Sequence, residues 1–301
     1  MKHLRTLTYI AEIARTGSIR RTAEKLNITP SALTRKLQDF EQELGTPVFE
    51  RIAQGVRLNA AGELLVRHIR DQVSDFERVK SHIADLSGVR RGHVAIACSQ
   101  AFVDHVLPQE IESYRARFPL VSFSVQVRDY HEAILALSRH EADLALILQP
   151  PPATELHILT SCEQPLCALM NAGHPLAGAG SVRLRDCLRF PLAMPDHSVA
   201  IRHLLDTAIA RMSLPADILI ESNSLEFLRN QALREQVVTF QVSSGIPAQP
   251  ELVARPIDTR DMPPTTVVLA HLRGRTLPIA ASKFADQLAN TLIADRLSGS
   301  A

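Results

Sequence analysis

The apolar positions at the start of the chain repeat with the spacing of short helices. Leucine, isoleucine and alanine recur at steps of three and four residues from Leu4 to Ala14, and the stripe ends at Gly17, a common helix terminator. Ser18 follows as an N-cap residue, which predicts a second helix from Ile19 to about Leu26.

A third helix is predicted after a short turn. Thr29 is a good N-cap, and Pro30 suits the first helical position because an N–H there would have no helical partner. We expect this helix to end before Gly45, with a core face formed by Leu33, Leu37, Phe40 and Leu44. The outward surface is then polar and basic: Ser31, Thr34, Arg35 and Gln38.

Two helices joined by a short turn, the second with small polar and basic side chains near its start, are typical of a DNA-binding helix-turn-helix. Hydroxyl groups reach base edges or phosphates, and an arginine can bind guanine through two hydrogen bonds. Beyond Pro47, segments 48–51 and 56–58 predict a hairpin with Arg51 and Arg57 on its arms, suited to phosphate contacts. The periodicity alone also fits a small packed module whose charges are merely solvated.

An apolar stripe from Gly62 to about Leu86 predicts one long helix. Ile69, Phe76 and Ile83 repeat every seven residues, and the stripe is too long for the small module beside it to cover. Pairing with a second copy of the chain is therefore expected, although a helix of an intramolecular bundle would show the same pattern. Residues 87–92 then have the composition of a hinge.

From residue 93 onward, short β-rich runs alternate with helical ones. The first set has the order of a parallel sheet, with strands at 93–98, 121–127 and 142–148 and helices at 103–118 and 131–139. A second set has strands at 165–170, 192–194, 218–221 and 237–240, helices near 200–212 and 224–234, a strand at 265–272 and a closing helix at 278–297. Two α/β lobes leave a cleft between them, and ligands bind beyond the carboxyl ends of such strands.

The composition is that of a globular chain with unevenly distributed charge. The 301 residues are 46% hydrophobic and 22% charged, with a formal net charge of +1, which excludes a uniformly basic nucleic-acid coat. Residues 1–60, however, hold ten lysines and arginines against six acidic residues. The basic part of the chain is therefore the predicted helix-turn-helix.

The remaining composition points to a protein without cofactor or membrane segment. The four cysteines form no C-x-x-C pair, so we expect buried reduced thiols rather than a metal site or a disulfide. No segment has the apolar length of a membrane-spanning helix, and no signal peptide is recognised at the start. We expect a cytoplasmic protein that does not contact a membrane.

Two other classes of protein fit the sequence less well. No G-x-S-x-G, H-E-x-x-H, P-loop or dinucleotide-binding fingerprint occurs, so we do not expect an enzyme. A free-standing solute-binding protein would explain residues 93–301 alone. It would need export, and the amino-terminal module would then have no role.

These motifs together resemble the LysR-type transcriptional regulators. The resemblance is strongest in residues 1–65, in Gly17-Ser18-Ile19, Ala23-Glu24-Lys25-Leu26, Ser31-Ala32-Leu33-Thr34-Arg35, Pro47-Val48-Phe49-Glu50-Arg51 and Leu58-Asn59-Ala60-Ala61-Gly62. Later segments are also similar, among them Glu141-Ala142-Asp143-Leu144-Ala145 and His174-Pro175-Leu176-Ala177.

The resemblance implies an α/β protein with three parts. These are a winged helix-turn-helix at 1–60, a linker and dimerisation helix with its hinge at 61–91, and a two-lobed effector domain like a periplasmic binding protein at 92–301. Lobe I takes about 92–162 and 266–301, lobe II about 163–265, and the assembly is a homodimer or homotetramer. The DNA-contacting residues carried over are Thr29, Ser31, Thr34, Arg35 and Gln38, with Arg51 and Arg57 on the wing. One departure is that Pro30-Ser31 stands where the family often has Gln-Pro, which predicts an altered operator preference.

Seven polar residues are expected around the effector cleft because they lie at strand ends and helix starts: Ser99, Gln100, Arg128, His197, Ser198, Ser222 and Asn223. Hydroxyl and N–H groups with one arginine suit a carboxylate or another small anion, although each residue would also serve as a helix cap. The expected partners are promoter DNA, a small-molecule effector and RNA polymerase. Effector binding should rearrange the paired DNA-binding modules of the assembly. This requires that the effector binds the two arrangements of the modules with different affinity.

Overall fold

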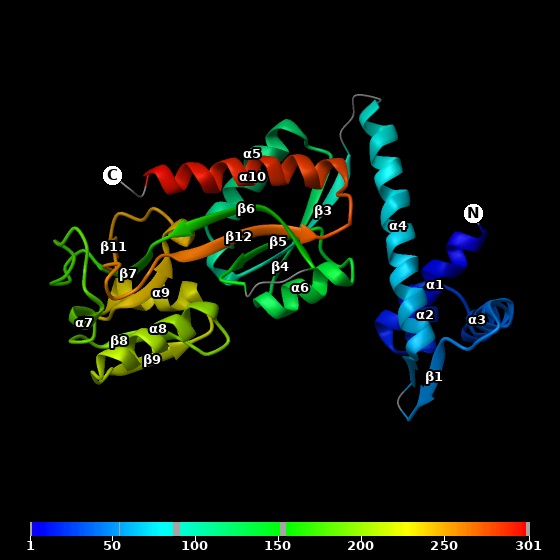
Figure 1. Ribbon diagram of the computed structural model, residues 1–301, viewed down its shortest axis with the longest axis horizontal. Helices are drawn as coiled ribbons and strands as arrows, with labels where there is room; N and C mark the ends of the chain where they lie inside the picture. The colour runs from blue at the N-terminus through cyan, green and yellow to red at the C-terminus, as the bar shows by residue number, and fades with distance from the viewer. Residues whose placement is uncertain (1, 54, 87–90, 151–154, 299–301) are drawn as a thin grey trace. The chain divides into compact units, whose positions relative to one another are not determined.

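The computed structural model describes residues 2–53, 55–86, 91–150 and 155–298 and divides into two compact units, Met1–Ile83 and Ala84–Ala301 (Figure 1). Each unit is described by itself. Residues 87–90 of the predicted hinge and Gln54 at the tip of the predicted hairpin lie outside the described residues.

The first unit is built from three short helices, a hairpin and one long helix. Its elements are α1 (Lys2–Thr16), α2 (Ile19–Lys25), α3 (Pro30–Leu44), β1 (Phe49–Ile52), β2 (Gly55–Leu58) and α4 (Ala60–Leu86). The predicted caps are present, since Ser18 Oγ accepts from Arg21 N and Thr29 Oγ1 accepts from Ala32 N. Gly45 ends α3 with a φ of 80°, a left-handed conformation that glycine adopts without strain.

The core of this unit lies between α1, α2, α3 and the first turns of α4. Ile13, Ala23 and Leu33 have no exposed surface, and Leu37 and Phe40 are buried beside them. The prediction that Leu44 belongs to this core is wrong, because 44% of its surface is exposed. Residues 42–47 are all exposed, so the last turn of α3 extends beyond the packed region.

The hairpin is anchored on the turn between α1 and α2. Its antiparallel register pairs Glu50 with Arg57, and Val56 N donates to Gly17 O at 2.9 Å. A Cβ atom at Gly55 would lie 2.2 Å from that same oxygen, so only glycine allows this close approach. The hairpin therefore has a fixed position beside the helix-turn-helix.

The second unit begins with a five-stranded sheet in the order β4-β3-β5-β12-β6. Its strands are β3 (Gly92–Cys98), β4 (Val121–Val127), β5 (Leu144–Leu148), β6 (Leu156–Gln164) and β12 (Thr265–Leu272). Strands β4, β3 and β5 are parallel, and β12 runs antiparallel to both β5 and β6. One face packs against α5 (Val106–Arg117) and α10 (Ile279–Ser298), the other against α6 (Tyr130–Ser138) (Figure 1).

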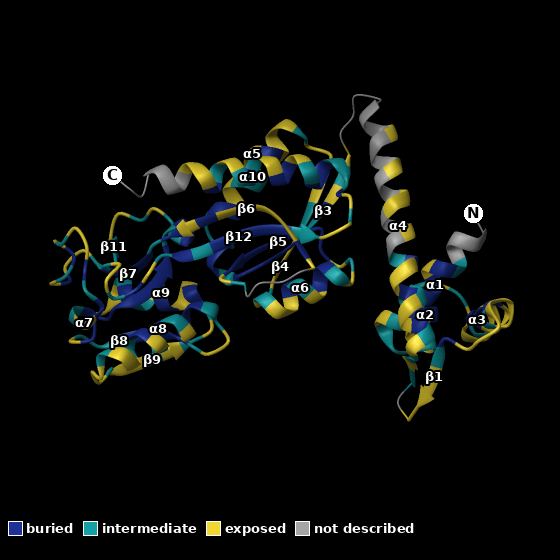
Figure 2. Ribbon diagram, viewed as in Figure 1, coloured by how far each residue is buried: buried dark blue, intermediate teal, exposed yellow. Residues whose placement is uncertain are grey.

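The rest of this unit forms a second lobe from two smaller sheets. One is antiparallel, in the order β10-β7-β11, and the other is the parallel pair β8-β9. The elements are β7 (Leu166–Asn171), α7 (Leu184–Cys187), β8 (Leu192–Pro195), α8 (Ala200–Met212), β9 (Ile218–Ser222), α9 (Leu225–Arg234), β10 (Thr239–Val242) and β11 (Leu252–Pro256). Figure 2 shows buried residues along the strands of both lobes and on the helices that pack against them.

Several predicted elements needed correction. The helix predicted at 103–118 starts later, because a 3-10 turn occupies Gln100–Phe102 and α5 begins at Val106. The strand predicted at 237–240 lies two residues further along, at Thr239–Val242. Strands β6 and β11 were not predicted at all.

The four cysteines are free and buried. Burial raises the pKa of the Cys98, Cys167 and Cys187 thiols to about 12, so they are protonated and poor nucleophiles at neutral pH. Among the residues with described structure, no helix combines the length and the apolar character needed to cross a membrane.

Candidate DNA-binding surface and effector pocket

The outward face of α3 carries the polar side chains that the sequence singled out. Ser31, Arg35 and Gln38 are exposed, as is the capping Thr29, whose hydroxyl lies 3.2 Å from that of Ser31. Thr34 is half-buried, and its hydroxyl donates to Pro30 O at 2.8 Å, so only its lone pairs are open to a further donor. These five side chains form a polar surface one helix wide.

The two wing arginines differ in their surroundings. Arg57 Nη2 lies 2.6 Å from Glu50 Oε1 on the neighbouring strand. Within the described part of the chain, no carboxylate forms an ion pair with the exposed Arg51 or with Arg35 of α3. A phosphate would therefore meet Arg35 and Arg51 directly but would compete with Glu50 for Arg57.

Three basic residues of α1 and α2, Arg15, Arg20 and Lys25, form ion pairs within the unit. Arg15 and Lys25 both lie 2.7 Å from Glu12 Oε1, and the hydrogen bond from Arg15 is the main cause that lowers the pKa of the Glu12 carboxyl. Arg20 lies 3.2 Å from Glu24. The Lys25–Glu12 pair joins α2 to α1, and each of the other two pairs lies within one helix.

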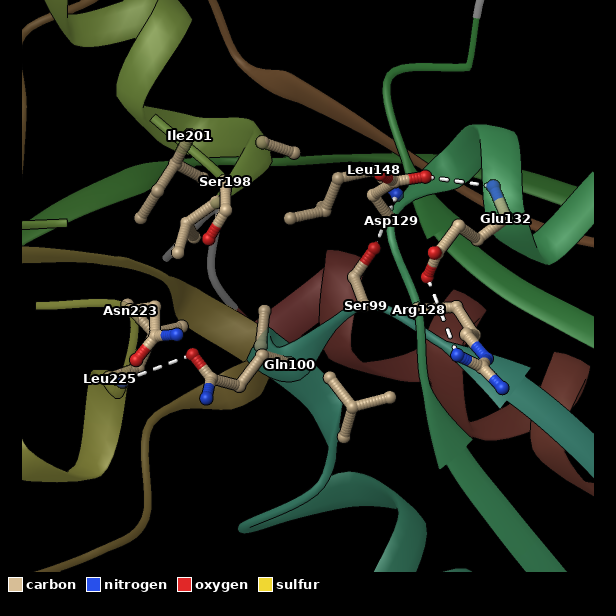
Figure 3. A pocket seen from close by; sticks show the side chains of 14 residues that line it. Ser99, Gln100, Arg128, Asp129, Glu132, Leu148, Ser198, Ile201, Asn223 and Leu225 are labelled. Atoms are coloured by element: carbon tan, nitrogen blue, oxygen red, sulfur yellow. Dashed lines mark hydrogen bonds and ion pairs between the residues drawn. The ribbon is translucent and has the colours of Figure 1, made fainter. Parts of the chain in front are cut away.

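The second unit contains a cavity of ≈ 390 Å³ where the two lobes meet. It lies beyond the carboxyl ends of β3, β4 and β5 and at the starts of α6, α8 and α9 (Figure 3). The residues that line it are Ser99, Gln100, Ala101, Val127, Arg128, Asp129, Glu132, Leu148, Ser198, Val199, Ala200, Ile201, Asn223 and Leu225.

Five of the seven residues predicted for the effector cleft line this cavity: Ser99, Gln100, Arg128, Ser198 and Asn223. The other two are engaged elsewhere. His197 Nδ1 lies 3.5 Å from Asp206 Oδ2, on α8, and Ser222 Oγ accepts from Ser224 N at 3.1 Å. Ser222 thus supports the turn that leads into α9, and the N-cap of α9 is Ser224.

Two of the lining side chains join the walls of the cavity. Gln100 of lobe I accepts a hydrogen bond from Leu225 N at 3.1 Å, which caps the first turn of α9 in lobe II. Ser99 accepts from Leu148 N at 3.3 Å and connects the ends of β3 and β5. Gln100, which lines the cavity, therefore links the two lobes (Figure 3).

A second link between the lobes lies outside the cavity. Arg229 of α9 has a side chain that is only 5% exposed, and its Nη2 lies 3.1 Å from Asp104 Oδ2. An unpaired arginine at such a position would be costly to bury. The pair therefore favours the lobe arrangement of this structure.

The charged residues of the cavity come from one segment, and only Arg128 among them is predicted from the sequence. Arg128 follows β4, Asp129 is the N-cap of α6, and Glu132 lies in the first turn of α6, where its N–H donates to Asp129 Oδ1 at 2.8 Å. Arg128 Nη1 lies 3.5 Å from Glu132 Oε2. An aspartate followed three residues later by a glutamate is a helix-start signature, and it would have placed both carboxylates beside Arg128.

The start of α8 forms the facing wall in lobe II. No side chain caps this helix, and Ala200 and Ile201 of its first turn line the cavity. Ser198 Oγ, 2.6 Å from Asp196 Oδ1, holds the pKa of that carboxyl below its ordinary value. Backbone N–H groups at an uncapped helix start attract negatively charged groups.

These two units define a DNA-binding module joined to a two-lobed ligand-binding domain. The chain matches the model of the bacterial regulatory helix-turn-helix proteins of the lysR family over residues 4–63 and that of the LysR substrate binding domain over residues 87–292. The chain therefore belongs to the LysR family of transcriptional regulators, and the fold class expected from the sequence is confirmed. It is a DNA-binding regulator with an effector-binding domain, and its family consists of regulators rather than enzymes.

Individual relatives are distant. A probable RuBisCO transcriptional regulator of Emiliania huxleyi is 27% identical over 82% of this chain and 80% of its own length. Among solved structures, a full-length single-residue variant of OxyR from Pseudomonas aeruginosa gives a TM-score of 0.67 at 20% identity, covering 96% of this chain and 94% of that one. Full-length CbnR in complex with its target DNA gives a TM-score of 0.61 at 15% identity, covering 96% and 99%. These structures support the fold.

Proposed function

We propose that two copies of this chain bind a promoter site with two-fold symmetry and release or rearrange on that site when a metabolite enters the lobe cavity. Residues 1–60 would contact DNA, 61–91 would form the linker and hinge, and 92–301 would bind the effector. The assembly would be a dimer or tetramer in the cytoplasm that changes the access of RNA polymerase. The observation that carries this proposal is the exposed polar surface of α3 on a chain that also holds a ligand-sized cavity.

The DNA contacts would be divided between α3 and the wing. Arg35 and Gln38 have the length to reach base edges in the major groove, and Thr29, Ser31 and Thr34 lie closer to the helix start, where phosphates are favoured. Arg51 and Arg57 would contact the sugar-phosphate backbone beside the groove. Two such modules fit half-sites separated by about one helical turn or a multiple of it.

Pairing of α4 would set that separation. Phe76, Val79 and Ile83 are 46%, 46% and 60% exposed in the single chain, and they continue the apolar stripe to which the buried Val66 and Ile69 belong. A second copy of α4 would cover these side chains. The DNA-binding modules would thereby be held at a fixed distance.

The effector would be a small molecule with a negatively charged or carboxylate group. Arg128, Ser99, Ser198 and Asn223 supply polar groups from both lobes, and the start of α8 supplies backbone N–H groups. A ligand that bridges both lobes can shift the regulator only if it binds the two arrangements with different affinity. The lobe-to-lobe contact of Gln100 with Leu225 N is one that such a ligand would alter.

The test uses a duplex from the region upstream of the protein's own gene, footprinted with and without a metabolite panel. We expect a protected dyad whose extent changes with one compound. Arg35→Ala should abolish protection while dimerisation persists, and Arg128→Ala should keep protection while the response to the compound is blunted. The proposal fails if both variants behave alike, because DNA recognition and sensing would then not be separable.

A further inference from the structure

The cavity has a charged end and a neutral end. Arg128 and Glu132 lie on one side of the view in Figure 3, and Ser198 and Asn223 lie on the other. Arg128, Asp129 and Glu132 are the charged residues among those that line it. One arginine and two carboxylates give this end a formal charge of −1 at neutral pH.

The single arginine is not free to receive a carboxylate by itself. Its Nη1 lies 3.5 Å from Glu132 Oε2, and its Nη2 donates to Gln126 Oε1 at 3.3 Å. A carboxylate placed on Arg128 would have to compete with Glu132 and would approach Asp129. Like charges at that range oppose each other, so this end disfavours a simple anion.

The same end suits a cationic group. Asp129 Oδ1 is occupied by Glu132 N at 2.8 Å, but a carboxylate has further lone pairs on both oxygens. Glu132 has a side chain that is 55% exposed and holds Arg128 only through the contact at 3.5 Å. An ammonium group placed between the two carboxylates would bring the net charge of this end to zero.

The neutral end offers the complementary place for a carboxylate. Helix α6 is capped by Asp129, and α9 is capped by Ser224 and Gln100. The 13-residue helix α8 has no side-chain cap, and Ala200 and Ile201 of its first turn line the cavity. Arg202 N of that turn already donates to Val199 O at 2.9 Å, so the N–H groups of Ala200 and Ile201 are the donors offered to an anionic group.

We propose that the effector is an aminocarboxylic acid, with its ammonium group between Asp129 and Glu132 and its carboxylate at the start of α8. The inference rests on the proposed role of the cavity as the effector site. The chain between the two charges would pass over the apolar lining, which includes Leu148, Ile201 and Leu225. A compound that carries only an ammonium group or only a carboxylate would bind at only one of the two ends of the cavity.

The test compares four six-carbon compounds that differ in charge: 6-aminohexanoate, L-norleucine, hexanoate and hexylamine. Binding to the full-length protein is measured by calorimetry. We expect at least one of the two aminocarboxylic acids to bind about tenfold or more tightly than both hexanoate and hexylamine. The inference is overturned if hexanoate or hexylamine binds as tightly as the tighter-binding of the two zwitterions, or if neither zwitterion binds at up to about 10 mM.

A variant that reverses the charge of this end tests whether the preference between compounds changes, and not only how tightly each compound binds. Asp129→Asn with Glu132→Gln keeps the size of both side chains, and asparagine is also a good N-cap, but the charged end changes from −1 to +1. We expect the preference to move toward hexanoate by about tenfold or more. Glu226→Gln is the matched control, since it neutralises an exposed carboxylate of α9 that does not line the cavity, and it should keep the wild-type preference.

Two further measurements separate the possible failures. If the double variant loses its cooperative melting transition, Glu132→Gln alone is compared in its place, and an unchanged preference in a folded variant overturns the inference. Operator binding of the wild-type protein is measured on the same samples. A protein that binds its operator but prefers simple anions contradicts this inference only, whereas a protein that binds no promoter DNA contradicts the proposed function.

Discussion

The ion pair on the wing predicts how DNA affinity should respond to substitutions. Arg57 is held by Glu50 at 2.6 Å, and the two side chains are 71% and 45% exposed. An exposed pair of this kind stabilises by about 0–1 kcal/mol, so Arg57 can leave it for a phosphate at small cost. Glu50 then remains as an unpaired negative charge next to the DNA backbone.

Removal of that negative charge should therefore strengthen DNA binding. Glu50→Gln removes the ion pair that Arg57 must leave before it contacts a phosphate. If breaking that pair costs about 0.7 kcal/mol, its removal raises the DNA affinity about threefold. If one more phosphate is fully neutralised, the slope of log affinity against log salt should steepen by about 0.9. Arg35→Ala removes an exposed arginine of α3 and should cost about 1–3 kcal/mol of discrimination between operator and unrelated DNA.

Fluorescence anisotropy of a labelled operator duplex, titrated at several salt concentrations, measures both quantities. Arg57→Ala should weaken operator and unrelated DNA alike, whereas Arg35→Ala should weaken the operator more. The reasoning is refuted if Glu50→Gln changes neither the affinity nor the salt slope, or if it weakens binding. Arg20→Gln serves as a control, because Arg20 is paired with Glu24 at 3.2 Å and is not assigned to the DNA surface.

Three further predictions concern the lobes, the linker helix and pH. Asp104→Asn should lower the unfolding free energy by about 1–3 kcal/mol in urea titrations, because Arg229 loses its carboxylate partner. An unchanged urea midpoint would contradict a stabilising role of this ion pair. Phe76→Ser should reduce the dimer fraction measured by sedimentation, and an unaltered dimer fraction would exclude α4 pairing through this residue. Burial lowers the pKa of His174, so the unfolded state binds more protons and stability should fall as pH drops from about 6.5 to 5. His174→Asn, whose amide oxygen can accept from Leu176 N as the ring does at 3.2 Å, should reduce that fall in urea titrations across pH, and an identical pH profile would contradict the assignment.

The helix-turn-helix could be predicted in detail because its signals are local. Capping residues, a proline at the first helical position and a glycine at the end define α3 within the chain itself. The misassigned Leu44 shows the limit of this reasoning, because helical spacing places a residue on a face but does not say where along the helix the core ends.

The missed strands depend on tertiary context. β6 is an edge strand of the five-stranded sheet, and three of its buried positions hold Thr160, Cys162 and Gln164, so no apolar alternation marks it. β11 ends in a proline and is half-buried throughout. Such strands form because β12 and β7 present unpaired edges to them, which a pattern along the chain does not reveal.

The residues of the effector cavity could be predicted only in part, because their positions also depend on tertiary context. Ser99, Gln100 and Arg128 follow strands whose carboxyl ends meet, so their place could be inferred from topology. His197 follows β8 and Ser222 ends β9, but local partners hold both outside the lining. Whether a polar side chain at a strand end faces a cavity or caps a helix depends on the local backbone conformation. The spacing of residues along the chain does not determine that conformation.

In vitro selection from a random duplex library with the wild-type protein at low ionic strength is the most direct test of the central claim. The account predicts enrichment of a motif with two-fold symmetry, whose information content falls at defined base pairs when the selection is repeated with Arg35→Ala. A library that shows no enriched sequence would contradict it, as would the same motif at full strength with the variant.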